Sequence, residues 1–257
     1  MRGASMISEF PLFVFTTLGG LAAGAYIAAA AFPLSGERKR PWLFPLVCLI
    51  LLGLGLIGVL FHLGRPMMFL NGLANPSAGI AQEAYFSIAF GILLLIDLII
   101  TCMKGKSPRA LQIVGAIVAL GLTIVMGMAY TANYGVPAWT SPVTVLLFVV
   151  GDLAMGAALL AVFDGELLKK NAFAITLGVL GIVAAVVFAA EAVHFSGVGA
   201  DIAAVIAGAV IVAVGWRAGL RGQVGKIGGQ AGAWIVLACV LVGVACARWG
   251  FYAACFI

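Results

Sequence analysis

Apolar runs about as long as a bilayer is thick recur along the whole chain. Between charged or Gly/Pro-rich breaks, the sequence predicts eight helices, at residues 11–33, 42–63, 82–103, 109–131, 142–163, 172–193, 199–217 and 230–250. A helix needs about 20 mostly apolar residues to span a membrane. We therefore expect an all-α, polytopic integral membrane protein with eight transmembrane helices, forming a single membrane domain over residues 1–257.

The composition excludes a water-soluble fold and nucleic-acid binding. Hydrophobic residues make up 64% of the chain and charged residues only 9%, whereas soluble domains carry about 25% charged residues. The formal net charge is +5, but the Lys and Arg residues lie in short loops between apolar runs. This pattern indicates orientation in a membrane, with lipid rather than nucleic acid as the surroundings.

The cations are distributed unequally between the two ends of the predicted helices. One set of alternate loops holds 11 of them: Arg38, Lys39, Arg40, Lys104, Lys106, Arg109, Lys169, Lys170, Arg217, Arg221 and Lys226. We assign only Arg2, Arg65 and Arg248 to the opposite side. Because cytoplasmic loops carry the excess of Lys and Arg, we expect both termini to be extracytoplasmic. His62, Glu83, Glu191 and His194 then lie toward the same outer side.

Two similar glycine-containing segments suggest an internal duplication. GGLAAGA (residues 19–25) and GDLAMGA (residues 151–157) agree at five of seven positions with an offset of 132 residues, which also carries His62 onto His194. An offset of four helices predicts two parallel repeats, at residues 8–131 and 140–257. The alternative is that small residues occur independently in both segments because they permit close helix packing.

The densest polar cluster lies between the second and third predicted helices, in FHLGRPMMFLNGLANPSAGIAQEAYF. It brings His62, Arg65 and Glu83 together at the membrane boundary, where ionisable groups need partners. An imidazole and a carboxyl can accept the protons released when a quinol is oxidised. The alternative is that these three side chains only cap helices and pair at the headgroup level.

Two other acidic residues, Asp97 and Asp152, lie inside predicted spans. They could form a proton relay, but a protonated carboxyl bonded to a neighbouring helix, or for Asp97 a pair with a loop lysine, is the favoured interpretation. Glu191 and His194 could form a second quinone pocket, with a weaker case than His62 and Glu83.

Several other classes of function remain open at this point. The five cysteines lack metal-ligand spacing, so we expect no iron–sulfur cluster in this chain. His62 and His194 could ligate at most one haem, as in a cytochrome b type anchor. A secondary transporter is the alternative from another class, although the polar residues cluster at one face rather than at the midplane where transporter sites lie. A structural anchor without a quinone site is the third.

The sequence resembles the membrane-anchor subunits of dimethyl sulfoxide reductase type molybdoenzymes. The matching stretches, in chain order, are EFPLFVFTTLGG, FHLGRPMMFLNGL with QEAYF downstream, AYTANYGVPAWTSP and ARWGFY. The resemblance implies an eight-helix anchor in the bacterial cytoplasmic (inner) membrane. Such an anchor oxidises menaquinol and passes electrons to a four-cluster iron–sulfur subunit and on to a molybdopterin catalytic subunit.

Carried over to this sequence, the resemblance assigns roles to individual residues. It places the quinol-associated histidine and its acidic partner at His62 and Glu83, the expected catalytic pair. Arg65 departs from the small residue expected before that proline, and with Tyr130 it completes the expected quinol-binding set. The resemblance also implies menaquinone or menaquinol as cofactor and no haem, so this protein would hold the quinol site of an oxidoreductase complex but not its terminal catalytic centre.

Overall fold

The computed structural model of the protein describes residues 2–34, 40–62, 73–220 and 229–254, and the side chains within 9–34, 40–60, 73–215 and 230–254. The long helices are α1 (Arg2–Ala31), α2 (Leu43–His62), α4 (Gly79–Lys104), α5 (Arg109–Thr131), α6 (Pro142–Phe163), α7 (Asn171–Gly197), α8 (Ala203–Leu220) and α10 (Gly229–Ala253). Two short 3-10 helices, η2 (Pro137–Trp139) and η3 (Gly165–Lys169), precede α6 and α7.

The expectation of an all-helical, polytopic membrane protein is confirmed. Within the described residues, seven helices are long and apolar enough to cross a membrane, and a shorter apolar helix, Ala203–Gly215, accompanies them. Large apolar side chains point outward: Ile117 is 66% exposed and Val214 is 63% exposed. A bilayer covers such side chains with lipid tails, and a helix satisfies its own backbone hydrogen bonds there.

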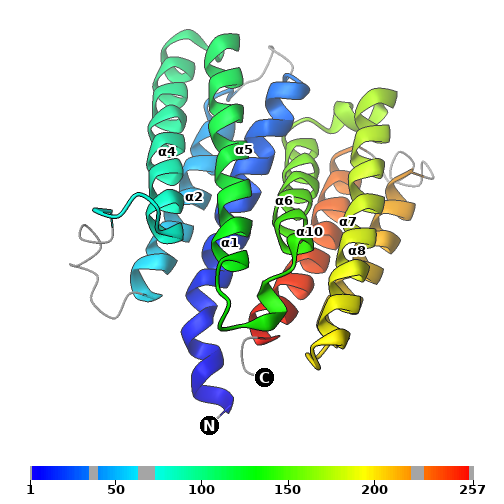
Figure 1. The fold of residues 1–257 in the computed structure, drawn as a ribbon. Helices are drawn as coiled ribbons and strands as arrows, with labels where there is room; N and C mark the ends of the chain where they lie inside the picture. Colours follow the sequence, from blue (N-terminus) through cyan, green and yellow to red (C-terminus); the bar gives the residue numbers. More distant parts are fainter. Residues whose placement is uncertain (1, 35–39, 63–72, 221–228, 255–257) are drawn as a thin grey trace.

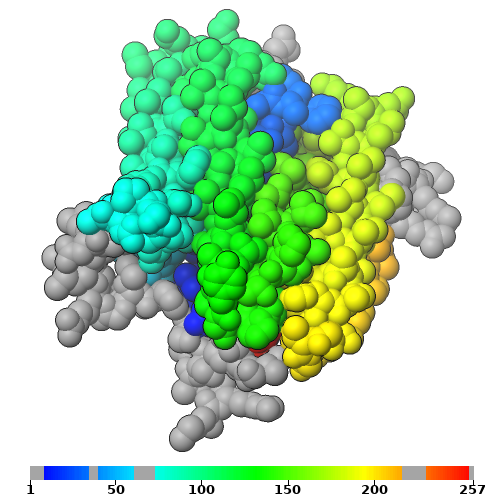
Figure 2. Space-filling view, in the orientation of Figure 1, coloured from blue at the N-terminus to red at the C-terminus, as the bar shows by residue number. Residues whose placement is uncertain are grey.

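The helices form two adjacent groups, and the described ends of the protein lie at the same end of the bundle (Figure 1). In the first group α1, α2, α4 and α5 pack on one another, and in the second group α6, α7, α8 and α10 do so. Contacts of α6 with α1 and α5, and of α10 with α1, join the groups. In the space-filling view, α5 of the first group and α6 of the second lie against each other at the boundary between the two groups (Figure 2).

The two glycine-containing segments meet where α1 crosses α6. A Cβ on Gly156 would lie 1.9 Å from the carbonyl carbon of Gly24, so only glycines allow the two backbones to approach this closely. Gly24 and Gly156 are equivalent under the offset of 132 residues. Contact between equivalent positions is what a two-fold axis between parallel repeats would produce, and it supports our proposal of repeats at residues 8–131 and 140–257.

A buried ion pair lies at the same crossing. Arg248 in α10 and Asp152 in α6 are both fully buried, and Nη2 of Arg248 lies 2.5 Å from Oδ1 of Asp152. Arg248 also donates hydrogen bonds to the carbonyl oxygens of Thr16 in α1 and Phe148 in α6. A Cβ on Gly20 would lie 1.8 Å from the Asp152 carboxylate. The pair therefore joins three helices.

This pair gives partners to two residues of the sequence analysis. Arg248, which falls within the predicted helix 230–250, lies near the end of α10 with no exposed surface. For Asp152 the favoured expectation is a carboxyl bonded to a neighbouring helix, and the structure shows such a bond, with the guanidinium of Arg248 in α10 as the partner. The physical reason is the same for both residues, because each isolated charge would be costly inside a bilayer and each satisfies the other.

Enlarging Gly24 should destabilise the crossing of α1 and α6. We expect Gly24→Leu to lower the free energy of unfolding by about 3 kcal/mol, because the new side chain would overlap backbone atoms of α6. Gly53→Leu in α2 is the matched control, since no atom lies within 4 Å of a Cβ built there. Denaturation in mild detergent measures both, and equal stability of the two variants would contradict the close contact.

Breaking the ion pair from one side should cost more than removing it from both. Arg248→Met leaves the Asp152 carboxyl buried without its partner, and we expect a loss of about 3 to 5 kcal/mol. Adding Asp152→Asn should restore at least half of that loss, because no uncompensated charge remains. A double-mutant cycle by denaturant titration measures the coupling, and additive effects would show that the two residues do not interact.

Candidate functional site

Glu83 is a buried carboxyl near the start of a membrane helix. It lies in the second turn of α4 and is 8% exposed, on the face that also buries Ala84 and Ser87. Its Oε1 has no hydrogen-bond partner among the described residues. A buried polar atom without a partner is costly, and such atoms are uncommon in native structures. This carboxyl oxygen is therefore available to a group that the described protein atoms do not supply.

Two tyrosine hydroxyls lie in electrostatic range of Glu83. They belong to Tyr130, in the last turn of α5, and Tyr252, near the end of α10. Their oxygens are 2.7 Å apart, and the Tyr252 oxygen is also 3.1 Å from Oγ1 of Thr16 in α1. A series of hydroxyls thus crosses from α5 through α10 to α1 at the end of the bundle where α4 begins.

Aromatic rings hold Tyr130 in place. Its ring stacks on Phe148 with centroids 5.3 Å apart and meets Trp139 and Phe251 edge to face. Trp139 lies in η2, which Pro137 begins, and its indole donates a 2.8 Å hydrogen bond to the carbonyl oxygen of Phe251. The connection between α5 and α6 is therefore fastened to α10, and the rigid surroundings fix the direction of the Tyr130 hydroxyl.

Thr16 connects the hydroxyl series to the buried ion pair. Its carbonyl oxygen accepts a hydrogen bond from Arg248, and its hydroxyl lies beside that of Tyr252. Arg248 also stacks over Phe148, with 5.0 Å between the guanidinium carbon and the ring centroid. The ion pair that joins α6 to α10 therefore also positions the groups that surround Tyr130.

Of the four residues predicted to bind quinol, the structure brings together Glu83 and Tyr130. The backbone of α2 ends at His62, but the side chain of His62 and all of Arg65 lie outside the described residues. The pairing of His62 with Glu83 therefore stays a prediction. The two helices that carry these residues, α2 with His62 and α4 with Glu83, do pack against each other.

The weaker candidate pair, Glu191 and His194, has other partners. Glu191 in α7 is fully buried and accepts a 2.8 Å hydrogen bond from Thr144 in α6. Nε2 of His194 lies 3.2 Å from the carbonyl oxygen of Pro137. Both side chains thus connect α7 to the start of α6 and the loop before it, which is a structural use of each.

Asp97 belongs to the other end of the bundle. The Tyr26 hydroxyl donates a 2.9 Å hydrogen bond to one carboxyl oxygen, and the Thr101 hydroxyl lies 3.3 Å from the other. The expected bond to a neighbouring helix is therefore confirmed, and among the described residues Asp97 forms no ion pair with a loop lysine. Fourteen residues separate Glu83 from Asp97, about 21 Å along a helix, so these two carboxyls belong to different sites.

Sequence reasoning missed Thr16 and the hydroxyl of Tyr252 as neighbours of Tyr130. Both lie within apolar runs, without a polar cluster around them in the sequence. Their bonds join residues 236 and 122 positions apart, which no local pattern can pair. The available signal was that both residues fall in the stretches that carry the family resemblance, EFPLFVFTTLGG and ARWGFY.

Comparisons with known proteins concern the sequence as a whole rather than the arrangement of this site. Residues 4–252 match the family model described as DMSO reductase anchor subunit (DmsC). The sequence is similar to the C subunit of polysulfide reductase from Wolinella succinogenes, with 26% identity over 59% of this protein and 56% of that one. It is also similar to the C subunit of anaerobic dimethyl sulfoxide reductase from Escherichia coli, with 31% identity over 59% of this protein and 56% of that one.

The matched segments span little more than half the length of either relative. The family match, in contrast, includes the first helix with Thr16, the start of α4 with Glu83, the end of α5 with Tyr130, and Tyr252 near the end of α10. On the strength of this match over nearly its whole length, the protein belongs to the DMSO reductase anchor subunit family.

Proposed function

We propose that this anchor subunit oxidises a quinol, with menaquinol as the expected substrate, at the end of the bundle where Glu83 lies. The observation that carries the proposal is the buried Glu83 carboxyl, whose Oε1 lacks a partner among the described residues, within electrostatic range of the paired hydroxyls of Tyr130 and Tyr252. These groups suit the polar end of a quinol, because its two hydroxyls need nearby acceptors and donors. The outward apolar helix faces suit its tail.

The reaction removes two electrons and two protons from the quinol and leaves a quinone. Glu83 would accept one proton and His62 the other, since a carboxyl and an imidazole are effective proton acceptors when they are placed within hydrogen-bond reach. The electrons would pass to an iron–sulfur subunit with four clusters and on to a molybdopterin catalytic subunit. In this division of roles the anchor would supply binding, orientation and proton transfer.

Tyr130 and Arg65 would bind the quinol without taking part in proton transfer. The Tyr130 hydroxyl can donate to a quinone oxygen or accept from a quinol hydroxyl, while Tyr252 and the aromatic rings around it hold its orientation. Arg65 is expected at the mouth of the pocket. This division leaves proton transfer to Glu83 and His62.

The described cations support an extracytoplasmic location for this site in a bacterial cytoplasmic membrane. Lys104, Lys106 and Arg109 lie where α4 meets α5, and Lys169 and Lys170 lie between α6 and α7. At the other end, the connections 132–141 and 198–202 contain no Lys or Arg, and the connection 63–78 contains one, Arg65. By the rule that cytoplasmic loops are basic, Glu83, Tyr130 and both termini would face away from the cytoplasm.

Neutralising Glu83 should abolish quinol oxidation without loss of assembly. We expect Glu83→Gln to lower turnover of a reduced quinol by at least about 100-fold, the contribution typical of a proton-transfer group. Asp201→Asn is the matched control at the same end of the bundle, because Asp201 caps α8 through the backbone N–H of Ala203. The assay uses the purified complex with its partner subunits, and wild-type turnover in Glu83→Gln would remove the basis of the site.

Removing the Tyr252 hydroxyl should weaken quinol binding rather than the chemical step. Tyr252→Phe fills the same space but leaves the Tyr130 hydroxyl without its 2.7 Å partner, so we expect KM to rise about five-fold, the effect of losing about 1 kcal/mol. Tyr134→Phe, at a residue that is 85% exposed, should change nothing. A fall in turnover at unchanged KM would assign Tyr252 to the chemistry instead.

A further inference from the structure

A cavity of about 240 Å³ opens at the end of the bundle opposite Glu83. The end of α1, the start of α2, the end of α4 and the start of α5 surround it, together with the loops between them. Its volume is several times the roughly 30 Å³ that one water occupies in the liquid. The cavity can therefore hold a polar group of several atoms.

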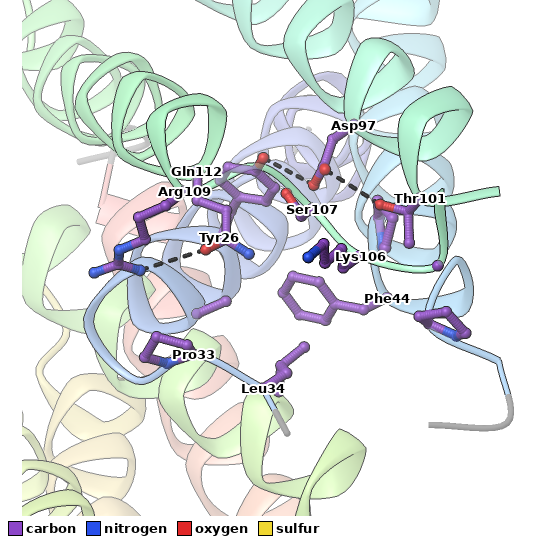
Figure 3. Close-up of a pocket in the computed structure, with 14 residues that line it drawn as sticks. Tyr26, Pro33, Leu34, Phe44, Asp97, Thr101, Lys106, Ser107, Arg109 and Gln112 are labelled. Atoms are coloured by element: carbon purple, nitrogen blue, oxygen red, sulfur yellow. Dashed lines mark hydrogen bonds between the residues drawn. The ribbon is translucent and has the colours of Figure 1, made fainter. Parts of the chain in front are cut away.

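Asp97 and its partners form one wall of this cavity (Figure 3). The Tyr26 hydroxyl and the Thr101 hydroxyl each occupy one oxygen of the Asp97 carboxyl. Asp97 is only 2% exposed, and the ring of Phe44 stacks on Tyr26 beside it. This acidic group is thus already engaged by hydroxyls of the protein rather than by a cation.

Two cations line the cavity, and neither has an acidic partner among the described residues. Lys106 and Arg109 belong to the loop after α4 and the first turn of α5 (Figure 3). Among the described residues neither forms an ion pair, and Arg109 bonds the neutral side-chain amide of Gln112 at 3.3 Å. At the same end of the bundle, Lys169 does pair with Glu166, at 2.8 Å. The positive end of the α5 helix dipole adds to the field of both cations.

We propose that this cavity binds the phosphate of an anionic phospholipid headgroup. An ammonium and a guanidinium recognise phosphate by charge and by several N–H donors, and basic pockets between membrane helices are suited to such headgroups. The helices that form the cavity also offer a surface for lipid tails, since Ile99 and Met103 on α4 are 50% and 78% exposed. The lipid phosphate would supply the counter-charge that the described residues do not give Lys106 and Arg109.

This lipid site is independent of the proposed quinol chemistry. It uses the opposite end of α4 from Glu83, and none of its lining residues belongs to the hydroxyl series around Tyr130. A bound headgroup there would bridge α1, α2, α4 and α5 at their ends. It would therefore stabilise the first helix group specifically in membranes that contain anionic lipid.

The test compares binding of phosphatidylglycerol and phosphatidylcholine to the full-length protein by native mass spectrometry in mild detergent. For the wild type we expect at least a five-fold preference for one molecule of phosphatidylglycerol. The double variant Lys106→Gln/Arg109→Gln should lose this preference. The charge-matched control Lys169→Gln/Lys170→Gln, at the same end of the bundle, should keep it.

Two further arms make the result decisive. Thermal unfolding with added phosphatidylglycerol should stabilise the wild type and the control but not the double variant, whose own unfolding without lipid shows that it is folded. Equal phosphatidylglycerol binding by all three proteins would overturn the site. Displacement of the lipid by millimolar glycerol phosphate or inorganic phosphate would overturn the lipid as the source and assign the cavity to a soluble phosphate.

Discussion

The ion pair between Asp152 and Arg248 connects the fold to the site. A charge inside a bilayer is tolerated only when another group of the bundle compensates it, and here each charge compensates the other across α6 and α10. The same guanidinium reaches the backbone of α1 at Thr16. α1 and α6 also approach within backbone contact at Gly24 and Gly156. The ion pair and these two glycines therefore determine together how the two helix groups pack against each other.

The rule that polar groups are satisfied inside the bundle makes the exceptions informative. Asp97 and Glu191 each have hydroxyl partners from a neighbouring helix, and Asp152 has an arginine. One oxygen of Asp152 and one of Glu191 also lack a partner among the described residues, but each of these carboxyls is bonded through its other oxygen. Oε1 of Glu83 has no partner among the described residues, and Glu83 lies within electrostatic range of a pair of tyrosine hydroxyls. In our proposal this end of the bundle receives a polar, redox-active lipid, and the unpartnered carboxyl oxygen is the physical basis of that quinol site.

Much of the fold could be predicted from the sequence, because hydropathy is a local property and each membrane helix carries its own signal. The predicted ranges overlap every long helix, although α1 begins earlier, at Arg2, and continues through Pro11. The family resemblance placed Glu83 and Tyr130 in one site, and the structure brings them into range of each other.

The partners of the polar residues could not be predicted in the same way. Arg248 falls within the predicted helix 230–250, but the sequence does not show that α10 continues to Ala253 and turns the arginine toward Asp152 in α6. Which hydroxyls meet Tyr130 depends on the rotation of three helices that are far apart in the sequence. Packing between helices determines these rotations, and no pattern within one run reports them.

The most direct test of the quinol site is photolabelling of the purified complex with a photoreactive menaquinone analogue, followed by peptide mapping. The account predicts labels at the start of α4, around Glu83, and at the end of α5, around Tyr130, with both labels lost in the presence of excess menaquinone. Labels confined to the opposite end of the bundle, around Asp97, or labels that excess menaquinone does not displace, would contradict it.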